Sequence, residues 1–83
     1  MYYVYVLKLS PKEKKNFYFG YTEDLKRRIR QHISGNVRST KGRDTKLIYY
    51  EAFESKILAM RRERGLKNSG SVYNALLRRL GLK

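Results

Sequence analysis

The sequence YYVYVLKL, residues 2–9, decides the fold class. It is rich in β-branched and aromatic residues, and NFYFGY at residues 16–21 has the same character. A polar stretch that carries the only proline of the chain separates the two segments, so they are predicted to form a β-hairpin. We expect Tyr5 to lie opposite Tyr18 in this hairpin.

This pairing sorts the side chains of the hairpin into two sets, one on each face of the sheet. The first set is apolar and comprises Val4, Val6, Phe17 and Phe19. The second set is rich in tyrosine and comprises Tyr3, Tyr5, Leu7, Tyr18 and Gly20. A slip of one residue would mix the two sets, which favours the proposed pairing.

A helix is predicted within residues 22–35, TEDLKRRIRQHISG, with Thr22 or Asp24 as its N-cap and Gly35 as its end. Residues 34–46 are polar and lack any helical or strand period, so we expect an exposed loop. LIYYEAF, residues 47–53, predicts a third strand.

Ser55 is expected to cap a second helix along residues 57–67, and Gly70 and Ser71 to interrupt the chain. A short third helix then begins at Val72, with an apolar side made of Leu76, Leu77 and Leu80. The prediction is an α+β fold: a small, mostly antiparallel three-stranded sheet flanked by about three helices, in the order β-β-α-β-α-α. With 83 residues the chain forms one domain, residues 1–83.

The composition points to a polyanionic partner. Twenty Lys and Arg residues against seven Asp and Glu leave a formal charge of +13, so we expect the protein to bind nucleic acid, DNA rather than RNA. Cysteine is absent, which excludes disulfides and thiolate chemistry. No stretch approaches the roughly 18 apolar residues of a membrane span, and the N-terminus lacks a basic leader, so a soluble cytoplasmic protein is the expectation.

Two charged side chains stand on the apolar side of the first helix. Leu25, Arg28, Ile29, His32 and Ile33 follow the spacing of a single helix face. Arg28 and His32 are therefore turned toward the sheet. They are either a snorkelling arginine and a hydrogen-bonded core histidine, or members of a site.

Glu63 has a similar position on the second helix. A helical wheel places it among Ala59, Met60 and Leu66, whereas the remaining surface carries Arg61, Arg62 and Arg64. A carboxylate at such a place needs a partner. That partner is a basic side chain if the role is structural and a divalent cation if the role is functional.

Two tripeptides of the predicted hairpin carry a family resemblance: Tyr3-Val4-Tyr5 and Tyr18-Phe19-Gly20. Arg28 follows eight residues after Gly20 and His32 four residues later. With the glutamate of AMRRERGLK, this pattern resembles the GIY-YIG endonuclease superfamily, above all compact stand-alone members of the UPF0213 kind and the N-terminal domain of the DNA-repair excinuclease. The resemblance extends from residue 2 to about residue 70.

The chain departs from the family pattern at three points. Tyr3 replaces a glycine and Phe19 replaces an isoleucine, which leaves both motif tyrosines in place. The family asparagine that follows the glutamate has no secure equivalent, since Asn68 and Asn74 are both candidates. Asn74 lies further downstream and is preferred, although a polar residue on an exposed helix face would look the same.

The resemblance implies metal-dependent hydrolysis of a phosphodiester bond. Tyr5, with Tyr18 or His32 beside it, would act as the general base or position it, and Arg28 would hold the phosphate. Glu63 would bind one Mg²⁺ or Mn²⁺ ion, which suits the preference of Mg²⁺ for few carboxylates. A tyrosine base needs a pKa well below about 10, and Arg28 and the metal are the available causes.

The other basic residues predict a phosphate-binding surface with little sequence specificity, because nothing in the chain resembles a base-reading helix or a zinc finger. The surface comprises Arg27, Arg30, Arg38, Lys41, Arg43 and Lys46. Two alternatives are also compatible with the sequence. One is a nucleic-acid-binding protein without catalysis. The other is a structural or protein-interaction module, which leaves the charge unexplained.

Overall fold

The computed structural model describes residues 1–10 and 16–82. Within these residues the strands are β1 (Tyr2–Ser10), β2 (Phe17–Thr22) and β3 (Asp44–Phe53). The helices are α1 (Leu25–Ile33), the 3₁₀ turn η1 (Arg38–Thr40), α2 (Lys56–Asn68) and α3 (Gly70–Arg79). The predicted α+β fold and its element order are confirmed, and the polar connection of the hairpin lies mostly outside the described residues.

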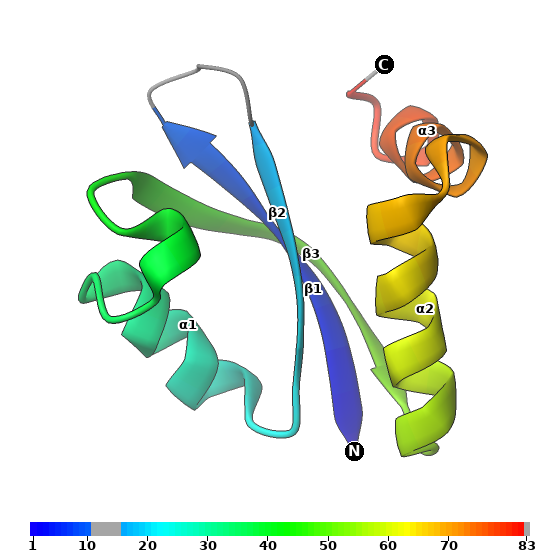
Figure 1. Cartoon of the computed structure of the whole chain (residues 1–83), viewed down its shortest axis with the longest axis horizontal. Coiled ribbons are helices and arrows are strands. Elements are labelled where there is room, and N and C mark those ends of the chain that lie inside the picture. The colour runs from blue at the N-terminus through cyan, green and yellow to red at the C-terminus, as the bar shows by residue number, and fades with distance from the viewer. Residues whose placement is uncertain (11–15, 83) are drawn as a thin grey trace.

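The sheet has the strand order β2-β1-β3, and β1 runs antiparallel to both neighbours. Figure 1 shows helices on both sides of it, with α1 and η1 on one face and α2 and α3 on the other. We call these the α1 face and the α2 face. β2 and β3 are the two edges of the sheet, and none of the described helices is long and apolar enough to cross a membrane.

The register of the hairpin differs from the prediction by two residues. Tyr5 lies opposite Gly20, and Tyr18 lies opposite Leu7. The predicted pairing of Tyr5 with Tyr18 is therefore wrong. A shift of two residues preserves the side of each residue, so the predicted division into two faces is confirmed.

The reason for this register is the close approach of the Tyr5 ring to the backbone of Gly20. A Cβ atom at Gly20 would lie 2.3 Å from Cζ and Oη of Tyr5, closer than any side chain can come. Only glycine leaves room for the ring at this position. If Tyr5 lay opposite Tyr18, as predicted, the Tyr5 ring could not take this position.

β3 begins at Asp44, three residues before the predicted start at residue 47. Its pairing with β1 contains a bulge, since Val6 pairs with Tyr49 but Leu7 pairs with Leu47. The extra residue, Ile48, packs together with Tyr49 against the core of the α2 face.

Helix α1 starts after Asp24, whose carboxylate accepts the N–H of Arg27 at 3.1 Å. Its predicted apolar face is correct except at Ile33, which is 69% exposed. The reason is that successive four-residue steps rotate by about 40° around a helix, so Ile33 has left the face that Leu25 begins. Gly35 ends the helix with φ of 79°.

Ser55 caps α2 as predicted, accepting the N–H of Leu58. The break between α2 and α3 is at Ser69 rather than at Gly70 and Ser71. Ser69 is both the C-cap of α2 and the N-cap of α3. Gly70 is consequently the first residue of α3, two positions before the predicted start.

Candidate active site

A chain of hydrogen bonds runs through the interior of the α1 face. The Tyr5 hydroxyl lies 2.8 Å from Nε2 of His32, and Nδ1 of His32 lies 2.8 Å from Oγ1 of Thr40. At the outer end, Nε of Arg28 donates to the Tyr5 hydroxyl at 3.4 Å. Tyr5, His32 and Thr40 are each at most 1% exposed, so the chain is shielded from water.

This chain corrects the expectation of an exposed loop at residues 34–46. Thr40, in η1, is fully buried, and Val37 is 6% exposed. Both side chains pack inward because η1 folds back against α1. Nothing in the periodicity of the segment marks either residue.

The direction of the protons follows from the donors. Arg28 can only donate, so the proton of the Tyr5 hydroxyl is directed toward Nε2 of His32. Nδ1 then carries the ring proton and donates it to Oγ1 of Thr40. The Thr40 hydroxyl can either donate or accept, so it accepts this proton, while the tautomer itself is set from Arg28 through Tyr5.

Burial sets the charge of both central groups. It raises the pKa of Tyr5 to about 12, in spite of the hydrogen bond from Arg28. Burial and the positive charge of Arg28 lower the pKa of His32 to about 4. Both groups are neutral at pH 7. Arg28 acts on the pKa of Tyr5 in the lowering direction that the sequence suggested for Arg28 and a metal together, but burial outweighs it.

Tyr18 lies beside this chain. Its ring centroid is 5.0 Å from that of His32 and 6.2 Å from that of Tyr5. Nζ of Lys67, from α2, is 5.8 Å from the centroid of the Tyr18 ring. Tyr18 belongs to the edge strand β2, and Lys67 brings α2 into contact with the cluster at that edge.

Glu63 joins the cluster from the α2 side. Its negative charge contributes to the raised pKa of Tyr5, and its side chain is only 23% exposed. The predicted partly buried carboxylate is therefore found, although its expected neighbour Met60 is 40% exposed. Glu63 forms an ion pair with Lys67 at 3.2 Å, one turn along α2.

Glu63 is a single carboxylate of the kind that Mg²⁺ takes as a ligand, and in this structure it is paired with Lys67. No group of three or more acidic or histidine side chains suited to a metal occurs in the described part of the chain. Mg²⁺ is commonly held by one or two carboxylates together with waters and phosphate oxygens. Glu63 is the carboxylate available for this arrangement.

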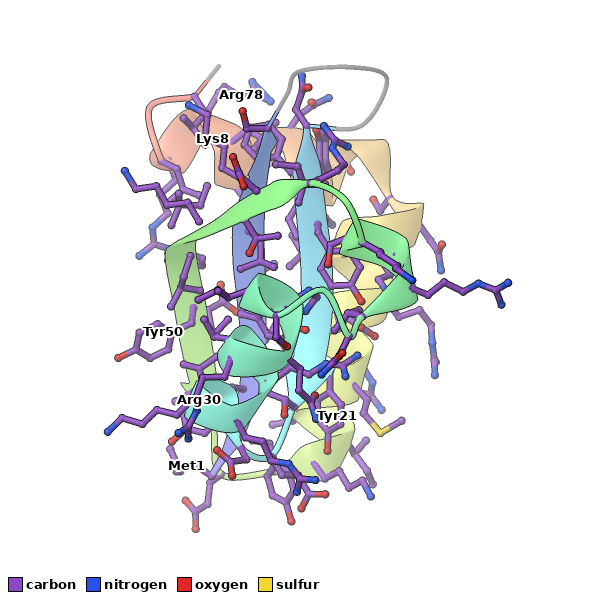
Figure 2. All side chains as sticks on the ribbon, turned by 90° about the vertical axis from the view of Figure 1, so that its left-hand side faces the viewer. Met1, Lys8, Tyr21, Arg30, Tyr50 and Arg78 are labelled. Carbon is purple, nitrogen blue, oxygen red and sulfur yellow. The ribbon has the colours of Figure 1, made fainter. Side chains whose placement is uncertain are left out.

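The predicted basic surface is only partly gathered at the site. Arg27 lines a cleft of about 380 Å³ together with Arg28 and Gln31, next to the hydrogen-bond chain. Lys46 lies on β3, at the opposite edge of the sheet, and Arg30 extends outward from α1 in Figure 2. The remaining three, Arg38, Lys41 and Arg43, lie in η1 and the loop that follows it.

Three further predicted polar residues differ from one another in burial. Arg43 departs from the expected exposed position, since it is half-buried and its Nε atom is shielded from solvent. The two candidate asparagines belong to different helices. Asn68 is the exposed last residue of α2, and Asn74 is half-buried in α3.

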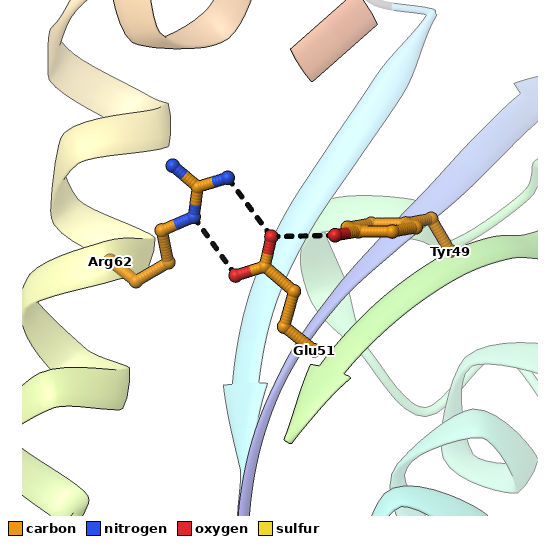
Figure 3. Close-up of polar contacts among 3 residues, drawn as sticks. All are labelled: Tyr49, Glu51 and Arg62. Atoms are coloured by element: carbon orange, nitrogen blue, oxygen red, sulfur yellow. Dashed lines mark hydrogen bonds and ion pairs between the residues drawn. The ribbon is translucent and has the colours of Figure 1, made fainter. Parts of the chain in front are cut away.

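A second polar cluster, on the α2 face, was not predicted from the sequence. Arg62 forms two hydrogen bonds of 2.9 Å with Glu51, and the Tyr49 hydroxyl donates to the same carboxylate at 2.7 Å (Figure 3). Burial opposes ionisation of Glu51, but the bonds from Arg62 and Tyr49 prevail and lower its pKa. The cluster joins β3 to α2 and has a structural role.

Comparison with known proteins assigns the chain to a family. Residues 1–74 match the model of the GIY-YIG catalytic domain. A UPF0213 protein of Halobacterium salinarum is 41% identical over 69 residues, which cover 81% of this chain and 86% of that protein. A UPF0213 protein of Clostridium perfringens is also 41% identical over 69 residues, covering 81% and 71% of the two chains.

The fold agrees with a solved structure from the same group. The solution NMR structure of a UPF0213 protein from Bacillus halodurans is 37% identical in sequence, with a TM-score of 0.58. The match covers 95% of this chain and 83% of that one. The chain is a compact member of the GIY-YIG nuclease family.

Proposed function

We propose that this protein hydrolyses phosphodiester bonds of nucleic acids, with Mg²⁺ or Mn²⁺ and with little sequence specificity. The observation that carries the proposal is the buried chain from Arg28 through Tyr5 and His32 to Thr40, with Glu63 near enough for its negative charge to act on Tyr5. A chain that joins a cation, a phenol and a neutral imidazole is suited to moving a proton next to a phosphate.

The proton transfer that the geometry supports has two linked parts. The attacking water would reach the Tyr5 hydroxyl beside Arg28, the partly exposed end of an otherwise buried chain. Tyr5 takes a proton from this water while its own proton passes to Nε2 of His32, so the phenol remains neutral. His32 becomes positively charged, which its pKa of about 4 opposes in the free protein, so the negative charge of the bound phosphate is needed to offset this. Thr40 still accepts from Nδ1. The hydrogen-bond chain thus uses Tyr5 as a proton carrier rather than as a free phenolate, which its high pKa disfavours.

Arg28 and Glu63 serve the phosphate in this proposal. Arg28 holds the non-bridging oxygens through those of its N–H groups that point away from Tyr5 and Gln31. Glu63 would hold the cation, which when bound supplies positive charge at the phosphate and at the leaving oxygen.

The test is cleavage of single-stranded, double-stranded, flapped and branched DNA and RNA in the presence of Mg²⁺ or Mn²⁺. We expect Arg28→Ala and Glu63→Gln each to lower kcat by roughly 10²–10³-fold, the usual effect of removing one stabilising group. Glu54→Gln is the matched control, because Glu54 is an exposed carboxylate just before α2. Cleavage by both site variants at the wild-type rate would disprove this site.

The pairing of Glu63 with Lys67 favours a second candidate, nucleic-acid binding without catalysis. In that case the wild type binds DNA or RNA in a salt-sensitive manner but cleaves none of the substrates with either metal. Lys67→Met separates the two candidates further. If the ion pair merely competes with the cation, the variant cleaves at lower Mg²⁺ concentration than the wild type.

A further inference from the structure

A cleft of about 650 Å³ lies along the outer edge of β2, next to the site. The start of β2 forms one wall, the junction of α2 and α3 forms another, and Ser39 of η1 closes a third side. Tyr18 and Lys67 belong both to this cleft and to the proposed site. The cleft therefore adjoins the proposed site.

The walls of the cleft combine flat rings with polar and cationic groups. Phe17, Phe19 and Tyr73 line it, and the ring of Tyr73 is fixed edge-to-face against Phe19, with centroids 5.5 Å apart. Lys67 and Asn68 supply a cation and an amide, and none of the described lining residues is acidic. Its volume is within the range of about 300–1,000 Å³ that is usual for small-ligand sites.

We infer that this cleft holds an unpaired base of the nucleotide adjacent to the scissile phosphate. The inference rests on the proposed function, since it extends the same site by one nucleotide. A base offers a flat apolar ring for Tyr73 and a polar edge for Asn68, and Lys67 faces the connecting phosphate. A base inside a regular duplex is stacked and paired and does not reach such a cleft, so the preferred substrate is unpaired at the point of cleavage.

The test measures binding without cleavage. The affinity for a short thymidine oligonucleotide is compared, in EDTA, with that for an abasic strand of the same length and phosphate number. One base stacked on an aromatic ring predicts a preference of about five- to 150-fold for the strand with bases. Tyr73→Leu should remove most of this preference, whereas Tyr50→Leu, at the β3 edge and 52% exposed, should leave it intact.

A photocrosslink locates the base independently of any variant. An oligonucleotide that carries 5-iodouracil is expected to form its adduct with residues of the cleft, above all Tyr73, as mapped by mass spectrometry. This measurement uses the wild-type protein, so a loss of stability in Tyr73→Leu does not affect it. Adducts confined to α1 or to β3 would overturn the inference.

The two proposals fail in different ways. Equal affinity for the thymidine and abasic strands, in a protein that cleaves nucleic acid, overturns the cleft and leaves the hydrolysis intact. A preference for bases that depends on Tyr73, in a protein that cleaves nothing, supports base binding in the cleft but overturns the hydrolysis, and with it the position of the base beside a scissile phosphate.

Discussion

The two faces of the sheet bury different kinds of side chain. On the α2 face the buried core is apolar and comprises Val4, Val6, Phe19, Ala59, Leu66 and Leu76. On the α1 face two buried tyrosines lie against a histidine and a threonine that are equally inaccessible. The α1 face also buries Leu7 and Leu9, so both faces contribute hydrophobic stabilisation, but only the α1 face uses part of its interior for a hydrogen-bond chain.

This contrast shows how a small domain can accommodate a polar interior. A buried polar group is costly unless it is paired, and the chain from Tyr5 to Thr40 pairs each of its members. The apolar packing across the sheet then fixes the strands that hold Tyr5 and Tyr18 in place.

The largest expected effect is on the stability of the α2 face. Leu76 is 3% exposed, so Leu76→Ala should lower the free energy of unfolding by about 2–5 kcal/mol in urea denaturation. Leu58→Ala is the control, since Leu58 is 51% exposed and should lose less than about 0.5 kcal/mol. Similar losses in both variants would contradict the assignment of the core.

The α1 face should make stability depend on pH through His32. Its pKa is about 4 in the folded protein against an ordinary value of 6.5, so the unfolded chain takes up the proton first as the pH falls. The free energy of unfolding should therefore decrease between pH 6.5 and pH 4, by up to about 3 kcal/mol. His32→Gln should remove this slope in urea denaturation at a series of pH values.

The carboxylate of Glu51 provides an internal comparison on the α2 face. Its pKa is lowered, so its contribution is lost only at more acidic pH, as the carboxylate is protonated. The decrease in stability that His32 causes should thus disappear in His32→Gln, whereas the decrease at more acidic pH, which comes from Glu51, should remain. A slope above pH 5 that persists in the variant would exclude His32 as its origin.

Gly20→Ala should disturb the α1 face from within the sheet. The added methyl group collides with the Tyr5 ring, so we expect a loss of roughly 1–3 kcal/mol and a displaced Tyr5 hydroxyl. Gly70→Ala is the matched control, because a Cβ atom there meets nothing within 4 Å. A crystal structure of Gly20→Ala with Tyr5 unmoved would refute this explanation of the register.

Thr40→Val keeps the shape of the side chain and removes its hydroxyl group. The Nδ1–H of His32 then lacks its acceptor, which should cost about 1–2 kcal/mol of stability. We also expect roughly tenfold slower cleavage and a shifted pH–rate profile, because protonated His32 loses the acceptor of its Nδ1–H. Thr40→Ser keeps the hydroxyl and should restore both the rate and the profile. If Thr40 served only to fill space, Thr40→Val would already keep both.

The smallest expected effect concerns the Glu51–Arg62 pair. Glu51→Gln should lower stability by about 1 kcal/mol, since the pair is bidentate but partly exposed. The rate of cleavage should not change, because the pair lies on the α2 face away from Tyr5. A large loss of activity at unchanged stability would connect this cluster to the site.

The division of the hairpin into two faces was predictable because strand periodicity is two, so even a register error of two residues preserved it. The register itself was not predictable, because it depends on the contact of the Tyr5 ring with Gly20. A glycine inside a strand is nevertheless a cue for a close approach of this kind.

Arg28, His32 and Glu63 were found from helical spacing because each lies within a well-defined helix. Thr40 was not predicted, because its burial comes from a contact between η1 and α1 that no local sequence pattern encodes. Met60 and Ile33 were placed wrongly because both stand at the margin of a helical face, where a few tens of degrees decide exposure.

The way in which α1 is held to the sheet has a consequence for its motions. Its apolar anchors Leu25 and Ile29 are only half-buried, and the buried contact is made by His32. A local opening of α1 would break the site without unfolding α2 and α3. Amide hydrogens of α1 should therefore exchange with solvent faster than those of the central strand, and a bound oligonucleotide that engages Arg28 should slow that exchange.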